Sequence, residues 1–210
     1  MDNLQYALAL DGTLGRWDFS LYGAWIFYDR PTIATTPDGL LRTYSRLTMQ
    51  GAAACLAQGN WLLKGETAFW QGLEFWSPAS EQFTRLDFLV GAEYSGLSET
   101  IVALELVDRH LLDYVPELRD CPEDPVEDDV QLTLRLTREF MHDRLRATFL
   151  VMALGLADDA AGIGRVQCDY EWREALIATA GLVLYQSGDR FPYEKIGDND
   201  RLFVELEYSF

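Results

Sequence analysis

The sequence predicts an all-β fold, an up-and-down antiparallel transmembrane β-barrel with about eleven visible strands in a single domain over residues 1–210. Three observations predict this architecture. Apolar and polar residues alternate with period two in most segments, as in a strand with one apolar face. Most of these segments run about ten residues or more, which suits a tilted strand crossing a bilayer. The connections between the segments are alternately short and long.

The expected strands show two distinct faces. In the fifth of them, Leu86 and Phe88 lie on one face while Arg85 and Asp87 lie on the other. A soluble sheet would alternate in the same way, so the period alone does not say which face meets solvent. In chain order the expected strands cover residues 3–11, 16–29, 42–56, 61–76, 83–94, 99–110, 128–140, 144–155, 164–173, 175–187 and 200–210.

The connections give the expected direction of each strand. Short turns are expected at 11–15, 57–60, 95–99, 141–144 and 173–175, and longer connections at 30–41, 77–82, 111–127, 156–163 and 188–199. Outer-membrane barrels have short periplasmic turns and longer extracellular loops, so this alternation is typical of them. A soluble sandwich gives no reason for one end to hold all the short turns.

Aromatic residues gather at both ends of the expected strands. Amphipathic rings prefer the headgroup level of a bilayer, so two aromatic girdles are typical of a membrane barrel. The expected periplasmic set is Trp17, Trp61, Tyr94, Phe140, Trp172, Tyr208 and Phe210, and the extracellular set is Trp25, Phe27, Phe75, Trp76, Phe83 and Tyr185.

Composition excludes several classes of protein. No run approaches the roughly 18 apolar residues of a membrane helix, which excludes a helical membrane protein. A net charge of −17 argues against a nucleic-acid partner, because phosphate binding needs an excess of Lys and Arg. The three cysteines Cys55, Cys121 and Cys168 are far apart and the chain has two histidines, so neither a metal site nor another cofactor is expected.

The C-terminal segment carries the most specific motif. Leu202, Val204, Leu206, Tyr208 and Phe210 alternate with mostly polar residues and end on a terminal aromatic carboxylate. With the segment Asn60-Trp61-Leu62-Leu63-Lys64-Gly65-Glu66, it resembles a porin-like group of uncharacterised large β-barrels in Gram-negative outer membranes. The resemblance implies an outer-membrane location, contact with outer-membrane lipid, and a C-terminal strand, with the five residues above, that the barrel-assembly machinery reads.

The N-terminal end departs from that pattern. Met1-Asp2-Asn3-Leu4 lacks the basic start and apolar core of a signal peptide. Counting back from a periplasmic Phe210, the first strand begins at the extracellular side, whereas bacterial barrels have an even strand number and periplasmic termini. The expectation is therefore the C-terminal part of a longer barrel with twelve or more strands. The alternative is a soluble β-sandwich or ligand-binding barrel.

The polar face of the expected strands would line the lumen of such a barrel. Its basic and acidic residues nearly balance, so the face either lines a wet channel or holds the wall rigid through cross-strand ion pairs. The candidate lumen-lining residues are Arg46, Lys64, Glu66, Arg85, Asp87, Glu93, Glu105, Arg135, Arg146, Asp169, Glu171, Glu205 and Glu207. The same assignment also places Arg16, Asp18, Arg42, Glu74, Arg109, Glu139, Arg144, Arg165, Arg173 and Arg201 on this face.

The function that follows is passive or gated passage of small solutes, with the solute unknown. A barrel without transport, whose extracellular loops bind a partner or divalent cations, is the alternative. Segment 113–129 holds eight carboxylates and three prolines and could bind cations, stay solvated or fold inward as a constriction. A surface hydrolase is a third hypothesis, but no Gly-x-Ser-x-Gly elbow is present and no serine accompanies His110, so no catalytic residue is assigned.

Overall fold

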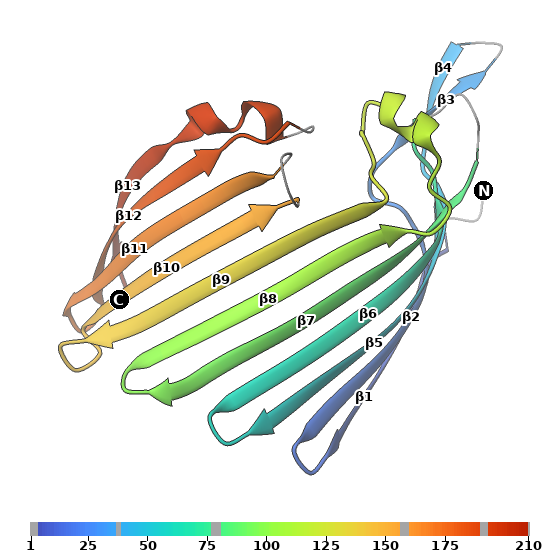
Figure 1. Ribbon diagram of the computed structural model, residues 1–210. Coiled ribbons are helices and arrows are strands. Elements are labelled where there is room, and N and C mark those ends of the chain that lie inside the picture. Colours follow the sequence, from blue (N-terminus) through green and yellow to red (C-terminus); the bar gives the residue numbers. More distant parts are fainter. Residues whose placement is uncertain (1–3, 37–38, 77–80, 156–159, 190–192, 210) are drawn as a thin grey trace. The chain divides into compact units, whose positions relative to one another are not determined.

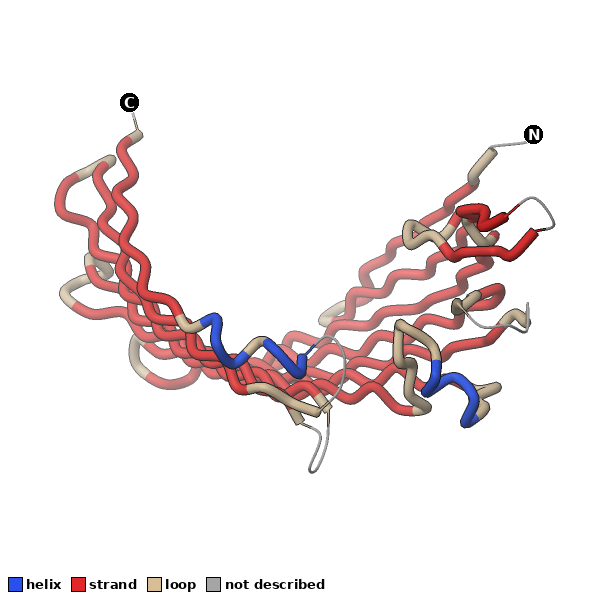
Figure 2. The backbone as a smooth tube through the Cα atoms, turned by 90° about the horizontal axis from the view of Figure 1, so that it is seen from above, coloured by secondary structure: helices blue, strands red, loops and turns tan. Residues whose placement is uncertain are grey.

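The structure, a computed structural model, describes residues 4–36, 39–76, 81–155, 160–189 and 193–209 (Figure 1). Phe210, the last residue of the expected assembly motif, lies outside these ranges, as do residues 1–3 and parts of four of the expected long connections. The described residues form strands joined by turns, with three short 3-10 helices in the connections, blue in Figure 2.

Eleven strands form one sheet in which each strand pairs with the next along the chain, apart from one inserted ribbon. This confirms the predicted all-β, up-and-down antiparallel architecture, and each of these strands corresponds to one of the eleven predicted segments. The strands are β1 (Tyr6–Leu14), β2 (Trp17–Phe27), β5 (Arg46–Gln58), β6 (Trp61–Leu73), β7 (Phe83–Leu97), β8 (Thr100–Leu111), β9 (Asp128–Phe140), β10 (Leu145–Leu154), β11 (Ala161–Arg173), β12 (Leu176–Gln186) and β13 (Arg201–Tyr208).

Strands β1 and β13 are the two edges of this sheet, and no pairing between described residues joins them. The closure of this sheet into a barrel therefore stays a prediction. Eleven strands of alternating direction leave the first and the last pointing the same way. A direct pairing of β1 with β13 would consequently be parallel. The pairings of β1 with β2, of β2 with β5 and of successive strands from β9 to β13 are all antiparallel.

The long connection predicted at 30–41 is present, but two further strands that were not predicted form there. Strand β3 (Thr32–Thr36) pairs with β4 (Gly39–Thr43) as a separate antiparallel ribbon. The hydroxyl oxygens of Thr32 and Thr43 lie 3.1 Å apart across it. β-branched residues favour extended backbone, and here they form a ribbon too short for the alternation of apolar residues to reveal.

The chain comprises two compact units. Unit 1 contains Met1–Leu56, Lys64–Val90 and Val107–Asp129, and unit 2 contains Ala57–Leu63, Gly91–Leu106 and Val130–Phe210. The expected alternation of short and long connections is confirmed. Hairpin turns join β1 to β2, β5 to β6, β7 to β8, β9 to β10 and β11 to β12, and all other connections of the sheet are longer.

The short turns require left-handed backbone. Gly15 and Gly59 have φ angles of 65° and 60°, which glycine adopts without a steric penalty. The turn between β11 and β12 instead places Ala175 at a φ of 72°, where a Cβ atom costs free energy. Tight turns with positive φ therefore set the register of these hairpins.

Candidate functional site

Cross-strand register separates the residues of unit 2 into two faces. Leu136 lies opposite Phe149, Phe149 opposite Val166, Val166 opposite Leu182, and Leu182 opposite Leu202. Residues directly opposite each other in an antiparallel pair share a face of the sheet. These five side chains consequently form one apolar row from β9 to β13, and the residues one position along each strand form the polar face.

The apolar face is exposed. On β13 the side chains of Leu202, Val204 and Leu206 are 76%, 77% and 70% exposed, and in unit 1 those of Leu8 and Leu14 are 76% and 73% exposed. The inner strands show the same feature to a smaller degree. Water-soluble proteins rarely expose apolar patches of such extent.

The expected assembly motif lies on this apolar face. Register places Tyr208, Leu206, Val204 and Leu202 opposite Leu176, Ala178, Ala180 and Leu182 of β12. The four described residues of the motif are exposed at the sheet edge. Their alternation is confirmed, and their reading by assembly machinery stays a prediction.

Arg46 lies on a different face from the one predicted. It stands opposite Phe27, on the face that also carries Trp25, Leu21 and Trp17. Its guanidinium carbon lies 3.7 Å from the centre of the Phe27 ring and 3.8 Å from that of Trp25. Aromatic faces attract cations and the aliphatic stem of arginine packs on apolar surface, which explains an arginine among apolar neighbours.

Asp87 is the centre of the polar face in unit 1. Its carboxylate accepts two hydrogen bonds from Arg85, at 2.6 and 2.8 Å, and one from the indole Nε1 of Trp70 at 2.9 Å. A fork of this kind is stronger than a neutral hydrogen bond and fixes the geometry of both groups. Trp70 was not predicted as a site residue, because an indole in an apolar run gives no sign of the carboxylate it contacts across strands.

A shallow depression of about 250 Å³ lies beside this carboxylate. Glu66 and Asp87, both predicted, line it together with Arg109 and Tyr22. Arg109 donates a hydrogen bond of 3.1 Å to Asp129 of β9. Lys64, also predicted, is half-buried two residues before Glu66, on the same face of β6.

The connection between β8 and β9 covers one end of this polar face. It contains the 3-10 helix η1 (Pro116–Asp120), whose Leu118 is 1% exposed. Leu118 belongs to a buried cluster with Leu47 of β5 and Leu111 of β8. Residues two apart in a strand share a face. Leu111 lies two residues after Arg109, and Leu47 lies two residues before Met49, which also lines the depression. Both leucines therefore lie on the polar face.

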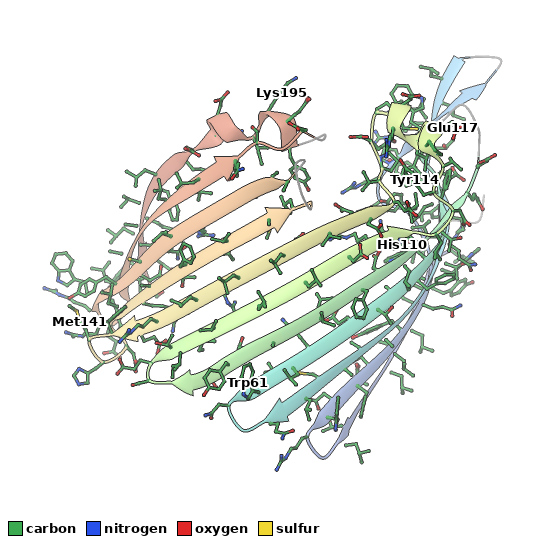
Figure 3. The ribbon with its side chains drawn as sticks, viewed as in Figure 1. Trp61, His110, Tyr114, Glu117, Met141 and Lys195 are labelled. Carbon is green, nitrogen blue, oxygen red and sulfur yellow. The ribbon has the colours of Figure 1, made fainter. Side chains whose placement is uncertain are left out.

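Of the expectations for segment 113–129, inward folding agrees with this packing. Two aromatic residues assigned to the extracellular girdle, Phe75 and Phe83, pack in the same cluster instead, with ring centres 5.4 Å apart. Figure 3 shows Tyr114 and Glu117 of this connection near the end of β8, where His110 lies. His110 Nδ1 is 2.7 Å from Asp128 Oδ1, a contact that sequence reasoning missed.

The polar face of unit 2 carries a ladder of charged and polar residues. Arg146 lies opposite Glu139 and Asp169, and its guanidinium is 2.8 Å from Glu139. Thr179 donates a hydrogen bond of 2.8 Å to Asp169 and stands opposite Glu205. The structure thus brings three predicted residues, Arg146, Asp169 and Glu205, into one row.

The other predicted residues of unit 2 lie close to this row. Glu171 and Glu207 both stand opposite Ile177, one row nearer the short turns. Arg135 forms an ion pair of 3.3 Å with Glu93. Glu105 is half-buried on β8. Cross-strand ion pairs, one of the two alternatives that the sequence left open, therefore do occur on this face.

Comparison with known proteins finds neither a family model nor a curated protein that matches this chain. Among the described residues, no helix is long and apolar enough to span a membrane. In the same part of the chain, no three His, Cys, Asp or Glu side chains gather closely enough to hold a metal ion.

Proposed function

We propose that this chain forms the wall of a Gram-negative outer-membrane β-barrel whose polar face lines a passage for small solutes. The observation that supports the proposal best is the exposed apolar face on the strands of both units. Burying one leucine side chain is worth about 1.5–3 kcal/mol, so a face with leucines more than two-thirds exposed has a large free energy to gain in lipid. A soluble sandwich would cover that face with a second sheet.

Strand length agrees with a membrane span. The strands of the sheet run from eight residues in β13 to fifteen in β7. A tilted strand crosses the hydrocarbon core with about 9–11 residues. All backbone polar groups must be paired inside lipid, so the proposed wall also requires partners for the edges β1 and β13. Because these edges run the same way, antiparallel closure takes an odd number of additional strands.

The β8–β9 connection gives this passage a constriction. Leu118 and Cys121 hold the connection against the polar face of unit 1, while Asp113, Glu117 and Glu123 remain exposed. A loop docked in this way narrows the space over the polar face and presents carboxylates to a passing solute. The solute passage is therefore gated by the docking of this loop.

Heat-modifiable gel mobility tests the closed wall. The chain would be extracted in detergent and run on a gel with and without boiling. A faster unheated band that also gives stepwise conductance in a planar lipid bilayer would support the proposal. A chain that stays folded and soluble without detergent would overturn it.

A further inference from the structure

An arginine row crosses the polar face of unit 2. Arg135 lies opposite Leu150, Leu150 opposite Arg165, Arg165 opposite Val183, and Val183 opposite Arg201. The three arginines therefore stand on β9, β11 and β13, separated by strands that contribute aliphatic side chains to the same row. Neighbouring strands are about 4.8 Å apart, so consecutive arginine backbones are about 10 Å apart.

An acidic row runs parallel to the arginine row. Each arginine is followed four residues later by a carboxylate on the same face, in the pairs Arg135 and Glu139, Arg165 and Asp169, and Arg201 and Glu205. Four residues of a strand span about 13 Å. The near balance of charge on this face thus conceals a row of three arginines and a second row, nearer the short turns, that carries these three carboxylates together with Arg146.

Arg135 forms an ion pair with Glu93, whereas the other two arginines of the row are held by neutral partners. Arg165 donates a hydrogen bond to the side-chain oxygen of Gln167, and its guanidinium carbon lies 5.3 Å from the centre of the Phe203 ring. Arg201 donates to the hydroxyl of Tyr185 and lies over that ring at 5.5 Å. Both guanidinium groups are thereby oriented while their charge stays available to an anion.

Strand β12, which lies between these two arginines, carries little side-chain bulk on this face. Val183 is the aliphatic residue that separates them, and Gly181, two residues away on the same face, has no side chain. A Cβ atom at Gly181 would overlap the Phe203 ring, which lies across this position. The glycine thus lets the Phe203 ring lie across β12, beneath the guanidinium of Arg165.

We propose that Arg135, Arg165 and Arg201 form a binding row for anionic solutes that carry phosphate or carboxylate groups. The inference rests on the proposed function, because it assigns a solute class to the proposed passage. Guanidinium groups bind such oxyanions through paired, charge-assisted hydrogen bonds. Several exposed sites of moderate strength let a solute enter and also leave. The row faces away from the apolar face, which favours a free anion over a lipid headgroup.

Direct binding tests the row without relying on conductance. Inorganic phosphate would be titrated into the folded chain in a non-ionic, phosphate-free detergent and followed by isothermal titration calorimetry. We expect the double variant Arg165→Gln/Arg201→Gln to bind phosphate about tenfold or more weakly than the unaltered chain. Each charged hydrogen bond to phosphate that is lost accounts for about a tenfold or larger loss of affinity. Arg144→Gln, which removes one positive charge from an exposed turn, is expected to bind as the unaltered chain does.

The outcomes separate the row from the passage. Arg201→Lys keeps the charge but removes the guanidinium fork. Its affinity for phosphate is expected to lie between that of the unaltered chain and that of the double variant. Gel mobility checks that each variant is folded. No phosphate binding by the unaltered chain, equal binding by the double variant, or loss confined to lipid-containing samples would overturn the inference. Phosphate binding by a chain that does not conduct even with its two edges closed by additional strands would refute the passage and keep the row.

Discussion

Replacing Leu118 by alanine is expected to undock the β8–β9 connection from the polar face. Leu118 is 1% exposed and packs in the cluster with Leu47, Leu73, Phe83 and Leu111. Truncating a buried leucine to alanine costs about 2–5 kcal/mol. The helix η1 is a single turn that cannot persist alone, so this loss falls on the docking of the connection.

The expected magnitude can be read by proteolysis. A loss of about 2 kcal/mol raises the undocked population roughly 30-fold, since 1.4 kcal/mol corresponds to a factor of ten. Trypsin has one site in the connection, Arg119, and its cleavage follows the open population when opening is fast. We expect cleavage after Arg119 to accelerate by about that factor in Leu118→Ala.

The matched control is Leu112→Ala, in the same connection, where the leucine is 48% exposed. This variant is expected to change the cleavage rate less than about twofold, because the side chain makes few buried contacts. Each rate is normalised to cleavage of the denatured variant, since Leu118 adjoins the scissile bond. Equal normalised rates for Leu118→Ala and Leu112→Ala would refute the docking of the connection through Leu118.

Three further substitutions, the first with a matched control, test the sheet, each by urea unfolding from detergent micelles. Gly72→Ala is expected to lower the free energy of unfolding by about 3 kcal/mol or more, because φ is 93° and the new Cβ would overlap the Arg46 carbonyl oxygen. The control Gly12→Ala has open space around it and is expected to be tolerated. Equal stabilities of the two variants would contradict this expectation. Ala175→Gly is expected to add about 1 kcal/mol by relieving a φ of 72°, and a loss would show that the turn is unstrained. Asp87→Asn is expected to cost about 1–2 kcal/mol through its weakened arginine fork, and an unchanged midpoint would refute that contact.

Local features of the sequence account for the part of the fold that could be predicted. Period-two alternation located all eleven strands of the sheet, because it marks a strand with one apolar face. Each alternating segment, such as 83–94, pairs with its neighbour in the sheet. Gly15 and Gly59 marked two turns through the backbone that they permit. The ribbon of β3 and β4 escaped prediction because five-residue strands are too short for a periodic pattern to distinguish them from a loop.

The site depends on contacts that only folding creates. Alternation placed Arg46 with the polar residues, but its register opposite Phe27 puts it on the apolar face, where it contacts two aromatic rings. Phe83 lies on the polar face of β7 and is buried because Leu118, far along the chain, packs in its cluster. The alignment of Arg165 with Arg201 follows from the register of β12 with both neighbours, which composition does not contain.

Opposite environments for adjacent residues of β11 would show that the apolar face meets lipid and the polar face meets water. Cys168 lies opposite Ala147 and Ala180 on the apolar face, whereas Gln167 lies on the polar face. In one chain, Cys55 and Cys121 are replaced by serine and a bimane fluorophore is attached to Cys168. In the other, all three native cysteines are replaced by serine and bimane is attached at position 167 through Gln167→Cys. Both chains would be folded into lipid vesicles.

We expect bimane at Cys168 to be quenched by nitroxide-labelled acyl chains and to be protected from iodide. Bimane at position 167 is predicted to show the reverse, since its face meets water. Quenching of both positions by iodide, with none from the lipid nitroxide, would contradict a membrane-embedded sheet.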